Sequence, residues 1–320
     1  MQKLLFISVA FFCIVGAMAQ KKLVVAQNGP ADFRSLQAAL DAVPAGIDVP
    51  YFIYIKKGIY EEPIIVDARK NFIHLIGEDK DSTVLTYHNH AGTRLPNGDT
   101  LNTWTCASTL VYANNFTAEN ITFSNTAGFS AGQAVALRIE GNRSVLRNCK
   151  IVANQDALFL SGSGVKQYFK DCYIEGTTDF IFGAATAVFK NCFIHSKKNS
   201  HVTAASTNSI IPFGFVFINC TLTADTSIHK VSLGRPWSPT ASVTYLYCRM
   251  DAHIVPEGWN NWKNPANELT ARFSEYKSTG PGASPSTRAS WSHQLTDEAA
   301  AKYTLEKIFG SWNPELTLLK

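Results

Sequence analysis

The stretch from residue 147 to residue 194 reads RNCKIVANQDALFLSGSGVKQYFKDCYIEGTTDFIFGAATAVFKNCFI and contains one short pattern three times. In RNCKI, KDCYI and KNCFI a polar residue precedes a cysteine, and an apolar residue stands two positions after it. The cysteines are Cys149, Cys172 and Cys192, so the spacings are 23 and 20 residues. A period of about 20–30 residues is typical of solenoid folds, in which each repeat forms one coil.

The pattern continues on both sides of this stretch. It recurs as INCTL (218–222) and LYCRM (246–250), and ENITF (119–123) has Ile121 at the place of the cysteine. The surrounding segments are rich in Val, Ile, Phe, Tyr and Thr, which indicates strands, and no helical pattern separates them. Parallel strands without crossover helices predict an all-β chain folded as a parallel β-helix, with the cysteines stacked inside it.

The two ends of the chain differ from the repeat. Residues 31–43 have apolar side chains at helical spacing and predict a short N-terminal helix that caps the open end of the solenoid. Residues 280–288 have the composition of a loop, and residues 296–309 predict a C-terminal helix with Thr296 as its N-cap. We expect one domain, residues 20–320.

The first 19 residues have the pattern of a cleaved secretory signal. Lys3 is followed by an apolar run and then by Ala17-Met18-Ala19. The run is short for a membrane span, and no later segment is apolar enough to cross a membrane. We therefore expect a secreted protein, extracellular or periplasmic, that is cleaved near Ala19 and has no membrane partner.

Composition and charge limit the classes of molecule that the protein could bind. The chain has 320 residues, 46% of them apolar, and a formal net charge of +4. Because no run of Lys and Arg resembles a nucleic-acid patch, we expect no nucleic-acid partner. The mild positive charge suits an acidic polymer, although it suits neutral partners equally well.

Six cysteines follow the predicted signal. They contain no CxxC pair and supply one residue per coil, which argues against a zinc site and favours small buried side chains. Coils about 4.8 Å apart would still permit one adjacent pair, Cys172 with Cys192, to oxidise in an exported protein. The histidines, among them His195 and His201, form no convincing ligand set, so we expect no metal.

Two aspartates lie at the same distance in sequence from a cysteine of the repeat. Asp156 comes seven residues after Cys149, and Asp179 comes seven residues after Cys172. If the cysteines stack, these aspartates lie side by side on consecutive coils, on the order of 5 Å apart. Gln133 lies another 23 residues before Asp156, which suggests a row of Gln133, Gln155 with Asp156, and Asp179 across three coils.

Two neighbouring carboxylates in partly apolar surroundings do not titrate alike. Repulsion and desolvation raise the pKa of one, which yields a proton donor beside a base or nucleophile. Glutamine N–H groups suit a developing oxyanion, and Arg235 in LGRPWSPT (233–240) could hold a carboxylate through two bonds. The alternative is a hydrogen-bonded polar ladder without catalytic function.

The aromatic residues near this row suggest a sugar ligand. Ring faces pack on the C–H surfaces of sugars while the rim of the site stays polar. Trp237 follows Arg235, Phe159 and Phe182 follow the two aspartates, and GWNNW (258–262) adds two tryptophans.

The motifs KGIYEE (57–62), GQAVALR (132–138), QDALF (155–159), DFIFG (179–183) and LGRPW (233–237) resemble, in order and spacing, those of the pectin methylesterase (pectinesterase) family. The resemblance covers the chain from about Leu23 to its end. It implies a right-handed parallel β-helix that removes methyl esters from the C6 carboxyl of galacturonate in pectin. It implies no cofactor, and we expect a monomer.

The resemblance also implies roles for individual residues. Asp179 would be the nucleophile, Asp156 the general acid and then base, Gln133 and Gln155 the oxyanion donors, and Arg235 the arginine that holds Asp179. Sugar-contacting positions would be Trp237, Phe159, Phe182, Thr240 and Thr105, and Cys172 with Cys192 would form a disulfide. Asn154 and Ala157 replace the tyrosine and threonine usual beside the acid, which puts the preferred methylation pattern in question.

Three other hypotheses remain. GFSAG (128–132) matches the nucleophile elbow of serine esterases, but that motif needs a helix after the turn, whereas QAVALRI alternates like a strand. We therefore regard Ser130 as a coincidence. Paired carboxylates beside aromatic residues also fit a β-helix polysaccharide hydrolase or lyase. A non-catalytic pectin-binding module is the third hypothesis.

Overall fold

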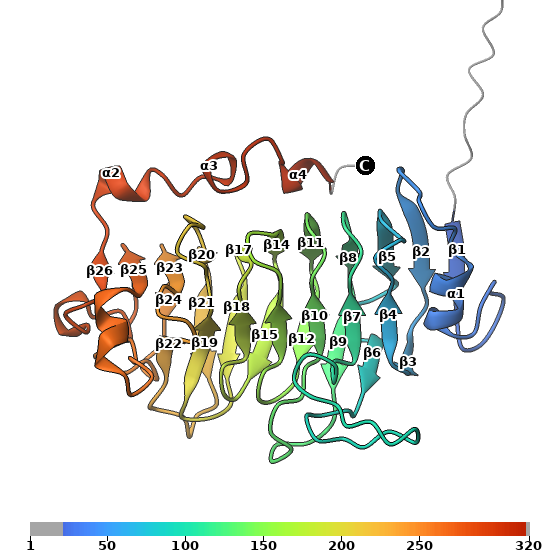
Figure 1. Ribbon diagram of the computed structural model, residues 1–320, viewed down its shortest axis with the longest axis horizontal. Coiled ribbons are helices and arrows are strands. Elements are labelled where there is room, and N and C mark those ends of the chain that lie inside the picture. Colours follow the sequence, from blue (N-terminus) through green and yellow to red (C-terminus); the bar gives the residue numbers. More distant parts are fainter. Residues whose placement is uncertain (1–21, 318–320) are drawn as a thin grey trace, which may run out of the picture.

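The computed structural model describes residues 22–317, which form a parallel β-helix (Figure 1). Its strands lie in three sheets, called A, B and C, and neighbouring strands in each sheet come from successive coils and pair in parallel. The predicted all-β solenoid is confirmed.

Each sheet runs along the axis of the solenoid, so the spatial order of its strands follows the chain. Sheet A contains β1 (Lys22–Val25), β2 (Tyr51–Ile55), β5 (Ile73–Gly77), β8 (Thr117–Glu119), β11 (Ser144–Arg147), β14 (Lys166–Lys170), β17 (Thr186–Lys190), β20 (Phe215–Ile218), β23 (Ser242–Leu246), β25 (Arg272–Tyr276) and β26 (His293–Gln294). Sheet B contains β3 (Gly58–Glu61), β6 (Thr83–Tyr87), β9 (Thr122–Asn125), β12 (Lys150–Val152), β15 (Tyr173–Gly176), β18 (Phe193–Ser196), β21 (Thr221–Ala224) and β24 (Arg249–Met250). Sheet C contains β4 (Ile64–Val66), β7 (Thr109–Val111), β10 (Leu137–Ile139), β13 (Leu158–Leu160), β16 (Ile181–Gly183), β19 (His201–Ala205) and β22 (Ser232–Pro236).

The cysteine repeat sets the register of sheet B. The residues that follow the cysteines pair from coil to coil, in the order Thr122, Lys150, Tyr173, Phe193, Thr221 and Arg249. The five cysteines therefore form one interior column, and Ile121 continues it. This is the stacking that the spacing predicts.

The polar residue before each cysteine has a role of its own. At this position the backbone has positive φ, for example 50° at Asn148, 55° at Asp171 and 55° at Asn191. Asparagine and aspartate adopt this left-handed conformation more readily than other non-glycine residues. The motif thus bends the chain from a strand of sheet A into a strand of sheet B, once per coil.

The structure does not contain the disulfide between Cys172 and Cys192. Both residues are buried free thiols, and each points to backbone carbonyls, with Cys172 Sγ 3.6 Å from the oxygen of Leu146 and Cys192 Sγ 3.7 Å from that of Phe169. The two cysteines occupy equivalent positions on consecutive coils, but their Sγ atoms contact main-chain oxygens and are not bonded to each other.

Aromatic rings fill the interior beside sheet A. The rings of Phe169, Phe189, Phe217 and Tyr245 stack coil on coil, with centroids 4.8, 4.5 and 4.4 Å apart. All four side chains are fully buried. This column and the cysteine column form one continuous core, which makes the coils a rigid support for the residues on the outer faces.

The N-terminal cap is shorter than predicted. Helix α1 spans Leu36–Ala42 and begins after Ser35, whose hydroxyl accepts the N–H of Ala38. Phe33, expected in the helix, instead forms a parallel bridge with Val25. The helix lies at the end of the solenoid beside β1, as expected (Figure 1).

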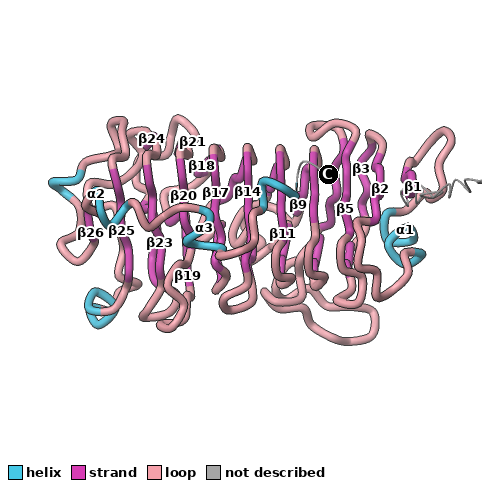
Figure 2. The backbone as a smooth tube through the Cα atoms, turned by 90° about the horizontal axis from the view of Figure 1, so that it is seen from above, coloured by secondary structure: helices cyan, strands magenta, loops and turns pink. Residues whose placement is uncertain are grey.

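The single helix predicted for residues 296–309 is wrong. The segment forms α2 (Asp297–Ala300) and α3 (Leu305–Phe309), and α4 (Pro314–Thr317) follows. Thr296 caps α2 as predicted, but Thr304 caps a second helix by accepting the N–H of Lys307. The break places Tyr303 where its hydroxyl accepts a hydrogen bond from Thr244 on sheet A, 3.2 Å away. The segment runs back along the solenoid over this sheet (Figure 2).

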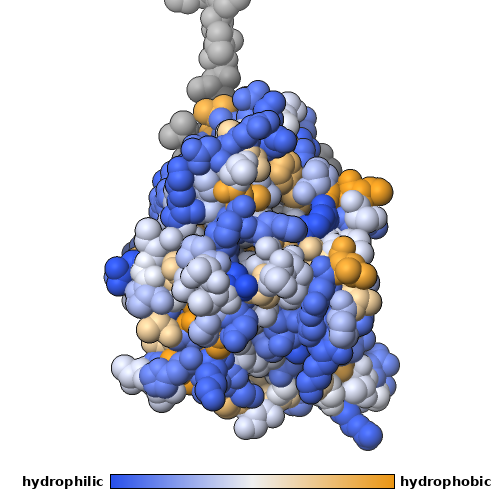
Figure 3. All heavy atoms as spheres, turned by 90° about the vertical axis from the view of Figure 1, so that its left-hand side faces the viewer, coloured by the Kyte–Doolittle hydropathy of each residue, from blue (hydrophilic) through white to orange (hydrophobic). Residues whose placement is uncertain are grey.

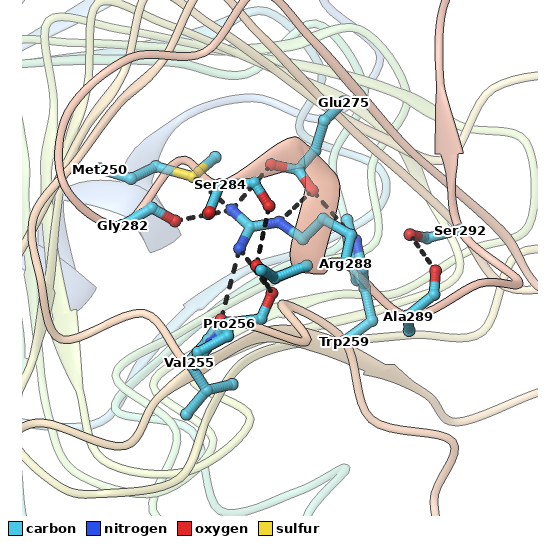
Figure 4. Close-up of polar contacts among 11 residues, drawn as sticks. Met250, Val255, Pro256, Trp259, Glu275, Gly282, Ser284, Arg288, Ala289 and Ser292 are labelled. Carbon is cyan, nitrogen blue, oxygen red and sulfur yellow. Dashed lines mark hydrogen bonds and ion pairs between the residues drawn. The ribbon is translucent and has the colours of Figure 1, made fainter.

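The C-terminal end of the solenoid is closed by residues outside the regular coils. Figure 3 shows this end as a largely hydrophilic surface with scattered apolar residues. Beneath it Arg288 pairs with Glu275, and both side chains are almost fully buried (Figure 4). The guanidinium also donates to the carbonyls of Pro256 and Gly282, and Trp259 donates to Glu275. Short 3-10 helices at Pro265–Leu269 and Pro285–Thr287 complete this end, the second within the predicted loop 280–288.

The predicted signal peptide, residues 1–19, lies outside the described residues. Within residues 22–317, no helix is both long enough and apolar enough to span a membrane.

Candidate active site

Asp156 and Asp179 lie two residues before β13 and β16, on consecutive coils. Leu158 pairs with Ile181, so the two aspartates share one register position, as predicted. Both have positive φ, 62° and 49°. The N–H of Asp156 donates to the carbonyl of Thr178, and the N–H of Asp179 donates to the carbonyl of His201. The backbone therefore fixes both carboxylates side by side.

The two carboxyl groups are buried, with 8% and 6% of each residue exposed. Burial and the neighbouring negative charge of Asp179 raise the pKa of Asp156 to about 8. Burial also raises the pKa of Asp179, but the guanidinium of Arg235 opposes that rise. Near neutral pH Asp156 therefore keeps its proton, whereas the guanidinium of Arg235 favours the ionised form of Asp179.

Arg235 reaches Asp179 from a strand two coils away. Phe182, Ala204 and Arg235 are paired neighbours across β16, β19 and β22. Because alanine occupies the middle position, the long arginine side chain can extend over it toward Asp179. Arg235 Nε donates to Oδ1 at 2.9 Å and Nη2 donates to Oδ2 at 2.5 Å. The guanidinium carbon lies 3.7 Å from the centre of the Trp262 ring.

Gln133 and Gln155 form a parallel bridge with each other. Gln133 therefore aligns with Gln155 and not with Asp156. The spacing of 23 residues between Gln133 and Asp156 thus misses the observed register by one residue. The side chain of Gln155 lies next to Asp156 and lowers its pKa, though less than burial raises it. Both glutamines line the same cavity as the aspartates.

This cavity has a volume of about 340 Å³. Its polar side is formed by the two aspartates, the two glutamines and Arg235, and its other residues are Thr103, Trp104, Phe182, Ala204, Trp237 and Trp262. All five predicted catalytic residues thus meet in one cavity.

The aromatic wall contains predicted and unpredicted residues. Phe159 and Phe182 stack with centroids 4.3 Å apart and are nearly buried, and Trp237 is 38% exposed. Phe159 is the partner of Phe182 on the neighbouring strand and does not itself line the cavity. Trp104, 48% exposed and 6.2 Å from Trp237, was not predicted. Its loop lies outside the repeat, so only its large exposed ring could have indicated it.

Two predicted sugar-contacting residues lie elsewhere. The Thr240 hydroxyl donates to the carbonyl of Thr207, and this residue lines a neighbouring depression of about 290 Å³. Thr105 is exposed, and its hydroxyl donates to the side chain of Asn102 at 3.3 Å. Neither residue lines the catalytic cavity, whereas Thr103 does.

Ser130 and Ala157 can be placed as well. Ser130 is exposed in a loop that leads to the Gln133 bridge and not to a helix, so it does not form a nucleophile elbow. Ala157 is fully buried, so its replacement of threonine alters the core and not a sugar contact. Among residues 22–317 no group of three His, Cys, Asp or Glu side chains could hold a metal ion.

Known proteins are similar to this chain over most of its length. The pectinesterase family model matches residues 22–311. Pectinesterase 31 of Arabidopsis thaliana is 41% identical over 295 residues, which are 89% of this chain and 92% of that protein. A pectin methylesterase from carrot superimposes with a TM-score of 0.85 at 31% identity, over 94% of this chain and 97% of that one. A pectin methylesterase solved in complex with a hexasaccharide has a TM-score of 0.81 at 30% identity, over 91% of this chain and 98% of that one.

The fold and these matches define an esterase built on a right-handed parallel β-helix. The chain belongs to the pectinesterase family.

Proposed function

We propose that this enzyme hydrolyses the methyl esters of galacturonate units in pectin, with Asp179 as nucleophile and Asp156 as acid and base. The observation that carries the assignment is the different state of the two aspartates. Arg235 binds both oxygens of Asp179, while burial and the nearby charge raise the pKa of Asp156 to about 8.

The first half of the reaction forms an acyl-enzyme. A carboxylate oxygen of Asp179 attacks the ester carbonyl carbon, and the carbonyl oxygen becomes an oxyanion. Gln133 and Gln155, which line the same cavity, offer side-chain N–H groups to this charge. When the intermediate collapses, the C–O bond to the methoxy group breaks, and Asp156 gives its proton to that oxygen, so methanol leaves.

The second half regenerates the enzyme. Asp156 is now a carboxylate and removes a proton from a water molecule, whose oxygen attacks the acyl carbon. The bond to Asp179 breaks, the galacturonate carboxyl is released, and Asp156 is again protonated. Asp156 can act first as the acid and then as the base because the first half of the reaction takes one proton from it and the second half returns one.

The lining of the cavity and the N-terminal segment also bear on the substrate and on where the enzyme acts. The aromatic wall of Trp104, Trp237 and Trp262 offers ring faces for sugar units on either side of the ester. We propose pectin as the polymeric partner, a monomeric enzyme, and export directed by residues 1–19 with cleavage near Ala19.

Methanol release from methylated pectin tests the proposal. Asp179→Ala and Asp156→Asn should each lose almost all activity, whereas Ser130→Ala should keep it. Size-exclusion chromatography of the product should show unchanged polymer length. Activity in Asp179→Ala, its loss in Ser130→Ala, or shortening of the polymer would contradict the mechanism.

A further inference from the structure

Two exposed side chains from coils three repeats apart contact each other, and the coils of Asp156 and Asp179 lie between theirs. Phe129 lies in the loop between β9 and Gln133, and Lys198 lies in the loop between β18 and β19. The Lys198 ammonium is 5.8 Å from the centre of the Phe129 ring, and 56% of Phe129 is exposed. A single exposed phenylalanine is common on protein surfaces; what distinguishes Phe129 is the cation that lies over its ring.

The contact extends across the coils that carry the catalytic residues. The loop of Phe129 leads into the coil of Gln133, and the loop of Lys198 leads into the coil of His201. The coils of Asp156 and Asp179 lie between these two. The carbonyl of His201 accepts the N–H of Asp179. His201 comes three positions after Lys198, and three residues of chain span at most about 11 Å. Lys198 therefore lies within about 11 Å of the backbone of His201, next to the coil of Asp179 and on the side of sheet B, although neither Lys198 nor Phe129 lines the cavity itself.

Lys198 differs in its charge environment from its neighbour in the chain. The ammonium of Lys197 is 2.9 Å from Glu175 and is neutralised by it. Within residues 22–317 Lys198 has no carboxylate at salt-bridge distance; its contact is the face of the Phe129 ring. The surface formed by Phe129 and Lys198 therefore presents an apolar ring and an unneutralised positive charge together.

From this geometry we infer that Phe129 and Lys198 form a binding subsite for a de-esterified galacturonate unit of the same pectin chain whose ester lies at Asp179. The C–H face of the sugar packs on the phenyl ring, and the ammonium pairs with the free carboxylate. This inference rests on the proposed function. It implies that the enzyme distinguishes pectin already carrying free carboxylates from fully esterified pectin.

The test compares Lys198→Gln with Lys197→Gln, which removes the same charge from the adjacent position. Methanol release is measured on fully methylated pectin and on pectin partly de-esterified with alkali, at equal ester concentration. Lys198→Gln should raise KM about 2- to 5-fold on the partly de-esterified polymer, with kcat unchanged on both polymers. Added salt should remove the difference between wild type and Lys198→Gln. Phe129→Ala should raise KM on the same polymer.

The controls separate this inference from the proposed function. Lys197→Gln should behave as wild type on both polymers. Equal effects of the two lysine variants, or an equal loss on both polymers, would overturn the subsite. Failure of the wild type to release methanol from either polymer would instead overturn the proposed function.

Discussion

Arg235 and Asp179 are joined by two parallel hydrogen bonds, 2.9 and 2.5 Å long, although their strands are two coils apart. The planar guanidinium matches the planar carboxylate, so the pair fixes the direction of the attacking oxygen as well as its charge. Lysine can supply the charge but not the geometry.

Arg235→Lys should therefore lower kcat/KM for methanol release by about 10²-fold or more, the loss expected when a bidentate charge-assisted contact is removed. Circular dichroism and the melting temperature should show a folded protein. Near-wild-type activity in this variant would show that the orientation of Asp179 does not depend on Arg235.

The raised pKa of Asp156 predicts the alkaline side of the pH profile. The proton that methoxide needs is present below about pH 8 and is lost above it, so kcat/KM should fall as the pH rises through this value. A pH–rate profile checks this. In Asp156→Asn the residual activity should lose this inflection.

The same carboxyl group should make the folded enzyme less stable as the pH rises. Its pKa is about 8 in the folded state and about 3.9 in the unfolded chain, so between these values the folded state binds a proton that the unfolded state lacks. Its contribution to stability is thus complete below about pH 4 and disappears by about pH 8. The melting temperature of Asp156→Asn should fall less between pH 5 and pH 8 than that of wild type; an equal fall would contradict the assignment.

Trp262 should position Arg235. Its ring lies against the guanidinium, and two consecutive residues of positive φ, Trp262 and Lys263, hold the loop in this shape. Trp262→Ala should lower kcat/KM about 5- to 30-fold, as expected for loss of a partly desolvated cation–π contact. It should also move the acidic limb of the pH profile upward, because Asp179 is then less well paired. Trp262→Phe should retain most of the activity and leave the limb in place.

The buried pair of Arg288 and Glu275 should control the stability of the C-terminal end. Arg288→Met leaves the carboxylate buried without its partner and should cost about 3–5 kcal/mol of unfolding free energy. The double variant Arg288→Met/Glu275→Leu removes both charges and should recover much of this loss. Thermal unfolding measures both; a single variant as stable as wild type would contradict the role of the pair.

The cysteine column should be insensitive to reductant. Because Cys172 and Cys192 are free thiols, dithiothreitol should leave the melting temperature unchanged. Alkylation of the unreduced, denatured protein should label both residues. A lower melting temperature in reductant would establish the disulfide that the resemblance implied.

The interior of this protein was easier to predict than its loops. One buried cysteine per coil fixes the register, so the adjacency of Asp156 and Asp179 follows from a spacing of 23 residues. Arg235 was placed by its motif, because no periodicity reveals a side chain that reaches across two coils. Trp104 and Phe129 lie in loops outside the repeat, where length and shape vary freely. The C-terminal helix was misjudged because contacts of Tyr303 with sheet A outweigh local helix propensity.

The left-handed backbone at Asp156 and Asp179 has a consequence for how this enzyme can lose its activity. Asparagine tolerates this conformation nearly as well as aspartate does, and it has almost the same shape. One such exchange removes the chemistry while the coil, the aromatic wall and the register survive. A variant with such an exchange would thus remain folded and able to bind carbohydrate, although it no longer catalyses the reaction.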